Sequence, residues 1–373
     1  MNDRLQVSPE IVTPDQSFWR QLTNELLFNC YTWLPDNTDT WRFAEPHPFQ
    51  RKIKDVLLRV PAKLGFYKEP GKYHASIEKV MNAGPFDQAM ACWTDDASRE
   101  LLVKLIAYRI LGSRHYRLPL NTPSYWQARR SIPGYVTKPA VIKSVPTFGT
   151  LDEFDYEGIR LVAHAIHILN TFIVEQYRCR RAGIGVRQGD IVIDGGACWG
   201  DTSLYFARQA EHIFAYECVP FNIALFQRNM DSNPGLAPRI TLIPKALWDV
   251  SGETLTFTDD GTASRADSAG TGPSVETQTI DDLVSEQNLK RVDLIKMDIE
   301  GAETKALLGA ERTIRRFRPR LAICVYHSLC DYIRIPEWVS NLDLGYRLYL
   351  DHFSIYHEES VLFADASSSD PAG

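Results

Sequence analysis

The stretch IVIDGGACWGDTSLYFAR, residues 191–208, decides the fold. Its first four residues, 191–194, have the apolar, β-branched character of a buried strand that ends on Asp194. A glycine-rich turn follows, and a helical pattern begins at Asp201. Strand, glycine-rich turn and helix in this order are typical of a nucleotide-type site in an α/β protein.

The chain from about residue 188 onward repeats the alternation of strands and helices. Short apolar runs predict strands at 191–194, 213–217, 240–244, 292–298, 321–327, 346–351 and 360–363. Amphipathic stretches predict helices at 201–210, 222–232, 303–315 and 331–342. No helix separates the last two strands. The pattern therefore predicts an α/β fold, a doubly wound, mostly parallel, Rossmann-like sheet with a C-terminal antiparallel hairpin.

The chain before residue 188 is harder to interpret. Only one helix is clear, at DDASRELLVKLIAYRILG, which Asp95 can cap and Gly112 can end. We predict a mixed or mainly helical N-terminal extension at 1–150, a connecting segment at 151–187, a catalytic domain at 188–364 and a disordered tail at 365–373. Between 252 and 279 only ETLTF is strand-like.

Composition excludes some classes of protein. A chain of 373 residues with 44% hydrophobic residues can bury a full core, and its net charge of -6 with a pI near 5.9 argues against nucleic-acid coating. No apolar stretch indicates a signal peptide or a membrane span. The seven cysteines contain no C-x-x-C pair, so we expect reduced thiols and a cytoplasmic protein.

The turn lacks the G-x-G-x-x-G pattern of dinucleotide sites. Asp194 and Asp201 flank it, and two carboxylates would repel a pyrophosphate but attract the sulfonium and ammonium groups of S-adenosylmethionine (SAM). Gly196 and Gly200 would let the backbone approach that cofactor, and Glu217 would accept hydrogen bonds from its ribose. The alternative is that Asp194 and Glu217 only cap helices.

These features place the cofactor contacts around the turn and the next strand ends. The predicted cofactor-binding residues are Asp194, Gly195, Gly196, Ala197, Cys198, Gly200, Asp201, Thr202, Glu217, Cys218, Asn222, Ala246 and Asp298. If the cofactor fills the space above Gly196, Gly196→Val should abolish SAM binding with little loss of fold.

Five blocks of the C-terminal half, in order, resemble the FkbM family of SAM-dependent methyltransferases. They are VIDGGACWGDTSLYFA, AYECVPFNIALFQRNM, TIDDL, VDLIKMDIEGAETKALLGA and RPRLAICVYH with IPEWV. The resemblance covers about residues 188–364 and implies a methyltransferase sheet with SAM as cofactor. One departure is Cys198, followed by the bulky Trp199, where the family usually has glycine or asparagine.

The acceptor should lie beyond the strands that end at Asp298 and His327. Residues 298–301 read DIEG, not the (D/N/S)PP(aromatic) tetrad of nucleic-acid amine methyltransferases, so we expect an oxygen acceptor. His327 is the predicted general base, and Asp298 would orient the hydroxyl or the base. The alternative for His327 is a buried histidine bonded to the backbone.

Further residues are candidates for the acceptor site and for a metal. The predicted substrate residues are Trp199, Glu300, Tyr326, Tyr332 and Arg265. Mg²⁺ held by Asp298 and Glu300 is the less favoured hypothesis, because this segment alone supplies too few ligands.

The resulting hypothesis is an O-methyltransferase that acts on a hydroxyl of a sugar, glycan or secondary metabolite, with the N-terminal extension covering the acceptor side. We expect a small-molecule or glycan partner, no nucleic acid and no membrane, and the sequence is compatible with a homo-oligomer. An NAD(P)-dependent oxidoreductase and a catalytically inactive SAM-binding scaffold are the alternatives.

Overall fold

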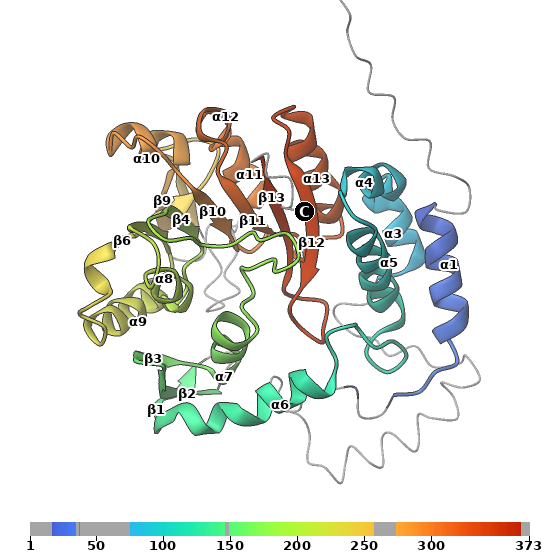
Figure 1. Ribbon diagram of the computed structural model, residues 1–373, viewed down its shortest axis with the longest axis horizontal. Coiled ribbons are helices and arrows are strands. Elements are labelled where there is room, and N and C mark those ends of the chain that lie inside the picture. Colours follow the sequence, from blue (N-terminus) through green and yellow to red (C-terminus); the bar gives the residue numbers. More distant parts are fainter. Residues whose placement is uncertain (1–16, 35–36, 38–74, 146–148, 257–273, 367–373) are drawn as a thin grey trace, which may run out of the picture.

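The structure is a computed structural model that describes residues 17–34, 37, 75–145, 149–256 and 274–366 (Figure 1). Arg265 and the tail residues 367–373, which figure in the predictions above, lie outside these residues. Among the described helices, none is both long enough and apolar enough to cross a lipid bilayer. All seven cysteines are described and are free thiols.

A seven-stranded sheet forms the centre of the C-terminal half, in the order β12-β13-β11-β10-β4-β5-β6. Its strands are β4 (Ile191–Gly195), β5 (His212–Tyr216), β6 (Ile240–Ile243), β10 (Leu294–Met297), β11 (Arg320–Cys324), β12 (Arg347–His352) and β13 (Ser360–Asp365). The pairs from β6 to β11 are parallel, and β13 is antiparallel to both β11 and β12. The predicted doubly wound sheet with its C-terminal hairpin is confirmed.

Helices connect the strands of this sheet. They are α8 (Asp201–Phe206), α9 (Pro220–Asp231), α10 (Ile280–Glu286), α11 (Glu303–Leu308), α12 (Glu311–Phe317) and α13 (Asp331–Asn341), with a short 3₁₀ turn, η4 (Ala237–Arg239). Among them, α10 was not predicted from the sequence.

The predicted single helix at 303–315 is wrong, because it is split into α11 and α12. The carbonyl of Gly309 accepts a hydrogen bond from the Asp281 amide at 3.0 Å and so does not continue the helical ladder. The Asp281 carboxylate then accepts hydrogen bonds from the amides of Arg312 (3.1 Å) and Thr313 (2.7 Å) and caps the new helix.

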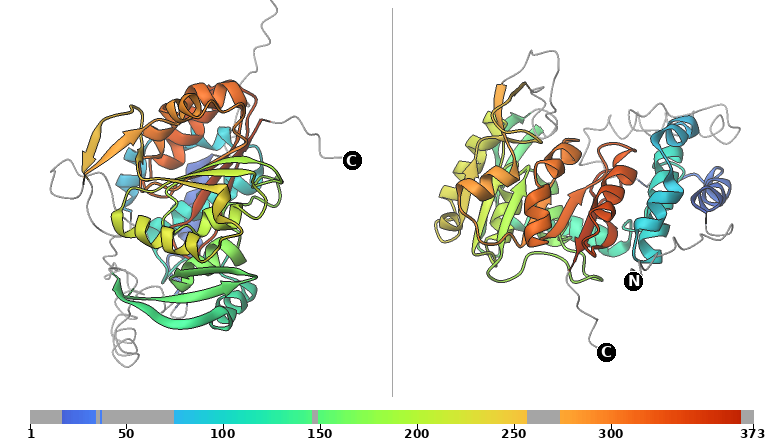
Figure 2. Two further views of the ribbon diagram at one scale, coloured as in Figure 1. Left: turned by 90° about the vertical axis from the view of Figure 1, so that its left-hand side faces the viewer. Right: turned by 90° about the horizontal axis from the view of Figure 1, so that it is seen from above.

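A group of N-terminal helices packs against one edge of the sheet. They are α1 (Phe18–Asn29), α3 (Ile77–Ala83), α4 (Phe86–Cys92) and α5 (Asp96–Leu111). Asp95 caps α5 by accepting from the Ser98 amide at 2.9 Å, and Gly112 ends it at a φ of 76°, so this predicted helix is confirmed. Figures 1 and 2 show the blue and cyan helices next to β12 and α13.

Hydrogen bonds join α5 and its N-terminal approach to β12. The Leu348 carbonyl accepts from the Thr94 amide, and the Leu350 amide donates to the Ser98 hydroxyl, both at 2.9 Å. These contacts cover the strand that would otherwise be the open edge of the sheet.

A second sheet, which the sequence analysis did not identify, precedes the central sheet in the chain and lies next to α9 (Figure 1). After α6 (Pro123–Ser131) and the 3₁₀ turn η2 (Ile132–Tyr135), it comprises β1 (Val136–Val145), β2 (Gly149–Tyr156) and β3 (Ile159–Ala163), all antiparallel. Asn229 on α9 binds both backbone groups of Val162, at 2.7 and 3.1 Å, as a neighbouring strand would. This amide contact docks the small sheet onto the domain.

Two other segments differ from the expected pattern. After β3, the short α7 (Ala165–His167) leads into a π-helical turn, η3 (Ile168–Ile173). Beyond β6, a three-stranded sheet orders β7 (Ala246–Leu247), β9 (Ser274–Gln278) and β8 (Thr254–Thr256). β8 lies within the strand-like ETLTF, whereas β9 falls in a stretch where the sequence analysis predicted no strand.

Candidate active site

The glycine-rich turn lies at the carboxyl end of β4, between β5 and β10. The amides of Gly196 and Ala197 both donate to the Tyr216 carbonyl, at 3.0 and 2.9 Å, and the Gly200 amide donates to the Ala197 carbonyl at 2.8 Å. These N–H groups are therefore engaged within the protein. A pyrophosphate site needs such amides to face the ligand, so this turn is not built as a phosphate cradle.

Asp194 has surroundings that differ from those assumed in the sequence analysis. Its side chain is 0% exposed, and one carboxylate oxygen accepts from the hydroxyls of Thr202 (2.7 Å) and Ser203 (2.6 Å). The other oxygen lies 2.9 Å from the Lys296 ammonium. The prediction that Asp194 attracts a sulfonium is therefore wrong, because Lys296 already neutralises the charge of the Asp194 carboxylate inside the protein. Asp194 and Thr202 fix the start of α8.

Lys296 is a member of the site that the sequence analysis missed. It lies in β10, is 1% exposed, and donates to the carbonyls of Gly195 (3.0 Å) and Gly196 (2.7 Å) as well as pairing with Asp194. Burial alone would lower the pKa of Lys296, but the carboxylates of Asp194 and Asp298 hold that pKa above its ordinary value. Lys296 thus pins the glycine-rich turn to the neighbouring strand.

Gly196 is required for packing within the protein, which overturns the expected effect of Gly196→Val. Its φ is 73°, and a Cβ atom there would lie 1.8 Å from the Asp298 carbonyl oxygen. Gly200 has a φ of 85°, and its Cβ would lie 2.1 Å from the Phe226 ring. Both glycines permit contacts of the turn with other protein atoms, so substitution should damage the fold before it affects any cofactor.

We expect Gly196→Ala to lower the free energy of unfolding by about 1–3 kcal/mol or more, because a backbone atom must move to admit even one methyl group. Urea denaturation measures this change. Gly189→Ala is the matched control. Gly189 has a similar φ of 83°, but among the described residues beyond its chain neighbours no atom lies within 4 Å of the position that a Cβ would take. Equal losses in the two variants would show that the φ value alone, and not the contact with Asp298, accounts for the effect.

Asp201 and Trp199 are likewise engaged with protein groups. Asp201 is buried, lies 3.3 Å from the His167 ring nitrogen and accepts from the Thr171 hydroxyl at 2.5 Å. Burial opposes ionisation, but His167 and Thr171 hold the pKa of Asp201 below its ordinary value. Trp199 is 1% exposed and donates to Asn222 at 2.8 Å. The predicted substrate contact of Trp199 is therefore wrong for this conformation, because no substrate can reach a buried ring.

Glu217 follows β5 at the position predicted for a ribose acceptor. One carboxylate oxygen accepts from the amides of Cys218 and Val219, both at 2.8 Å. Burial raises the pKa of this carboxyl, against the opposing effect of hydrogen bonds from these amides and from Asn222. The helix-capping alternative thus describes part of its role, since it orders the turn before α9.

The other predicted cofactor residues lie close to this edge of the sheet. Cys198 has a φ of 49°, the left-handed conformation that favours glycine or asparagine and so accounts for what the family usually has there. Cys218 directly follows Glu217, and Ala246 begins β7 after β6. Burial raises the pKa of the Cys198 thiol, which stays protonated at neutral pH.

Asp298 lies just beyond β10 and is held by two tyrosines. Tyr177 donates to one carboxylate oxygen at 2.9 Å, and Tyr326 donates to the other at 3.0 Å. Tyr177 comes from the segment before the central sheet, and the sequence analysis did not identify it. The two phenols fix the orientation of Asp298, whose side chain remains partly exposed at 19%.

His327 lies between three carboxylates, with its side chain 3% exposed. Its Nε2 is 3.4 Å from Asp298 and 3.6 Å from Glu300, and its Nδ1 is 3.1 Å from Glu303. Burial alone would lower the pKa of His327, but Glu303, Glu300 and Asp298 together raise it to about 10. The imidazole expected to titrate near neutral pH is therefore an imidazolium in this structure.

Tyr326 and Tyr332, both predicted to line the acceptor site, have different positions. Tyr326 stacks on His327 with ring centroids 4.1 Å apart and lies at the site. Tyr332 is 0% exposed and donates to the Ser360 hydroxyl at 2.9 Å. A substrate contact for Tyr332 is therefore wrong in this conformation, because the side chain is part of the core.

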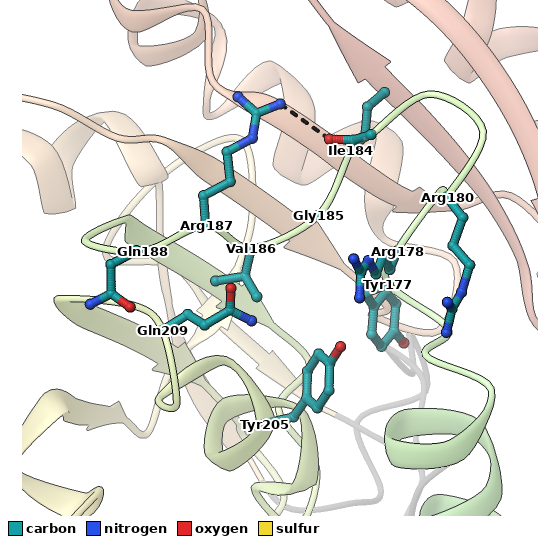
Figure 3. A pocket seen from close by; sticks show the side chains of 11 residues that line it. Tyr177, Arg178, Arg180, Ile184, Gly185, Val186, Arg187, Gln188, Tyr205 and Gln209 are labelled. Atoms are coloured by element: carbon teal, nitrogen blue, oxygen red, sulfur yellow. Dashed lines mark hydrogen bonds between the residues drawn. The ribbon is translucent and has the colours of Figure 1, made fainter.

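A cavity of about 430 Å³ lies beside the central sheet, away from the glycine-rich turn (Figure 3). Its lining includes Tyr177, Tyr205 and the arginines 178, 180 and 187, and none of the predicted cofactor residues. Glu175 pairs with Arg178 at 3.1 Å and also with Arg180. The guanidinium groups of this cavity are partly neutralised, and Tyr177 is the residue that it shares with the candidate active site.

The sheet order and its parallel pairs give the chain a Rossmann-like α/β fold. Residues 183–348 match the profile described as the methyltransferase FkbM domain.

Two individual proteins illustrate the relationship. The chain is 30% identical over 151 residues to the 2-O-methyltransferase NoeI of Sinorhizobium fredii (strain NBRC 101917 / NGR234), a match that covers 34% of this chain and 60% of that protein. It thus spans less than two thirds of that curated relative. The crystal structure of methyltransferase FkbM from Methylobacillus flagellatus KT superposes with a TM-score of 0.52 at 16% identity, over 85% of this chain and 71% of that one, which shows the common fold.

Proposed function

We propose that this chain transfers a methyl group from SAM to a hydroxyl group of a sugar, glycan or secondary metabolite. Two features of the turn after β4 support SAM as the cofactor. The turn amides donate to protein carbonyls, and Glu217 follows the end of the adjacent strand β5. This arrangement suits a ligand with a ribose and no phosphate.

SAM, when bound, supplies a methyl group on a sulfonium, and the protein has to bind it, exclude water and align the acceptor. The turn between β4 and α8 and the segment after β5 would hold the cofactor, with Glu217 accepting from ribose hydroxyls. Lys296 pairs with Asp194 and donates to the Gly195 carbonyl, and these contacts fix the turn. The cofactor site is therefore preorganised before the cofactor binds.

The acceptor half rests on the residues beyond β10 and β11. Asp298, fixed by two phenols, would take up the proton of the acceptor hydroxyl, and the His327 imidazolium would hold that carboxylate in position. The absence of the amine-methyltransferase tetrad at 298–301 and the name of the relative NoeI, a 2-O-methyltransferase, support an oxygen acceptor.

The N-terminal helices would cover the acceptor side, because the Arg109 guanidinium on α5 donates to the Tyr326 carbonyl. We place the reaction in the cytoplasm, since all seven cysteines are free thiols.

Calorimetric titration with SAM, S-adenosylhomocysteine and NADH tests the cofactor. Binding of NADH and not of SAM would favour the oxidoreductase alternative. Incubation of the SAM-bound protein with a panel of sugar and glycan acceptors then tests turnover, and binding without any methyl transfer would favour the inactive scaffold.

Glu217→Ala should weaken SAM binding by about 1–3 kcal/mol, because ribose hydroxyls lose their buried acceptor. Calorimetry on variants with the parent circular dichroism spectrum measures the change. Glu211→Ala is a suitable control, since Glu211 is an acidic residue at the opposite end of β5 whose side chain is 65% exposed. An unchanged SAM affinity in Glu217→Ala would remove this residue from the cofactor site.

A further inference from the structure

Three side chains of potential metal ligands converge beyond β10 and β11. One ligand atom each from Asp298, Glu303 and His327 lies within 4.8 Å of the others. In a tetrahedral site with bonds of about 2.1 Å the ligand atoms lie about 3.4 Å from one another, so the three side chains must move closer together to bind one ion.

The cluster also contains buried polar atoms whose hydrogen bonds are unmet. Glu303 is 1% exposed, and its Oε2 has no hydrogen-bond partner among the residues that the structure describes. The ring nitrogens of His327 make no hydrogen bond of good geometry and contact the carboxylates of Glu303 and Asp298 as ion pairs at 3.1 and 3.4 Å. Buried polar groups nearly always have partners, so Glu303 Oε2 is available as a ligand atom.

Surrounding groups hold the ligand side chains in place. Tyr177 and Tyr326 donate to Asp298, and the Ile299 amide donates to Glu303 Oε1 at 2.8 Å. Glu300 adds a further negative charge 3.6 Å from His327 Nε2. Such outer contacts are what orient the ligands of metal sites in proteins.

We propose that Asp298, Glu303 and His327 bind one divalent transition-metal ion. An imidazole together with carboxylates favours ions such as Mn²⁺, Fe²⁺ or Zn²⁺ over Mg²⁺ and Ca²⁺, which prefer oxygen ligands alone. This ion class differs from the Mg²⁺ considered from the sequence, and Glu303 replaces Glu300 as the second carboxylate ligand. The proposed metal binding concerns the chain without cofactor or acceptor and does not depend on the methyl transfer proposed above.

The test uses the full chain, stripped with a chelator and dialysed. Titration with Mn²⁺, followed by the electron paramagnetic resonance signal of the free ion and by calorimetry, should show one ion bound per chain. The ion should raise the melting temperature, because it binds the native state. The affinity for Mg²⁺ should be at least about tenfold lower than the affinity for Mn²⁺.

Glu303→Gln and His327→Gln should each weaken Mn²⁺ binding by about tenfold or more, and Asp298→Asn serves if either fails to fold. Glu311→Gln is the matched control. Glu311 is an acidic residue on α12, its side chain is 39% exposed, and it pairs with Arg315. The proposal is overturned if the parent chain binds no ion stoichiometrically, which would leave the His327 imidazolium as the cation of the cluster. Equal weakening in Glu311→Gln would also overturn it.

Discussion

His327→Ala should lower the rate of methyl transfer by about 10² or more while leaving SAM affinity nearly unchanged, because the Asp298 carboxylate loses the group that positions it at the acceptor. The physical reason is the location of His327 among Asp298, Glu300 and Glu303, beyond β11 and away from the glycine-rich turn. Single-turnover kinetics and SAM calorimetry on the same preparation measure the two quantities.

A second buried histidine provides the control for this variant. His352 is also buried, but it lies in β12, where its ring contacts the Ser360 hydroxyl at 2.8 Å, on a strand at the far edge of the sheet. His352→Ala should lower the melting temperature and spare turnover per folded molecule. If His327→Ala also lowers the melting temperature and spares turnover, His327 is a packing residue and does not position Asp298 for the reaction.

Lys296→Met should lower the free energy of unfolding by about 3–5 kcal/mol, because it leaves the fully buried Asp194 carboxylate without its cation. The glycine-rich turn also loses two hydrogen bonds to its carbonyls. Urea denaturation measures the loss, and SAM binding should fall with it, since the turn is no longer fixed to β10.

Two further variants separate the buried charge from a general loss of lysine. Lys305→Met removes an exposed pair with Asp249, at 2.6 Å, and should cost less than about 1 kcal/mol. Adding Asp194→Asn to Lys296→Met should recover part of the stability, because no unpaired charge then stays buried. A Lys296→Met variant as stable as Lys305→Met would contradict the role assigned to this pair.

The central sheet was predictable because each strand is a short apolar run that ends in turn residues. The antiparallel hairpin followed from the absence of a helix between residues 351 and 360. The split between α11 and α12 was not predictable from periodicity, since it depends on Asp281, a residue of another helix, capping α12. The β1–β3 sheet was missed for a similar reason, because Asn229 and Asn233 of α9 supply part of its pairing.

The candidate site was predictable in position but not in its internal pairing. The ends of β4, β5, β10 and β11 meet at one edge of the sheet, so Glu217, Asp298 and His327 were expected there. A lysine within the apolar run 292–297 was the available signal for a buried ion pair, since buried lysines need a carboxylate partner. Tyr177 gave no such signal, because a loop brings it to Asp298.

The position of β13 has a practical consequence for anyone who shortens this protein. The family match ends at residue 348, inside β12, whereas β13 (Ser360–Asp365) lies between β12 and β11. A fragment cut at the boundaries of the match would therefore lose an interior strand, and β11 would present unpaired backbone groups to other molecules. Such bare strands recruit one another, so we expect that fragment to self-associate into aggregates. Useful truncations must retain the chain through Asp365.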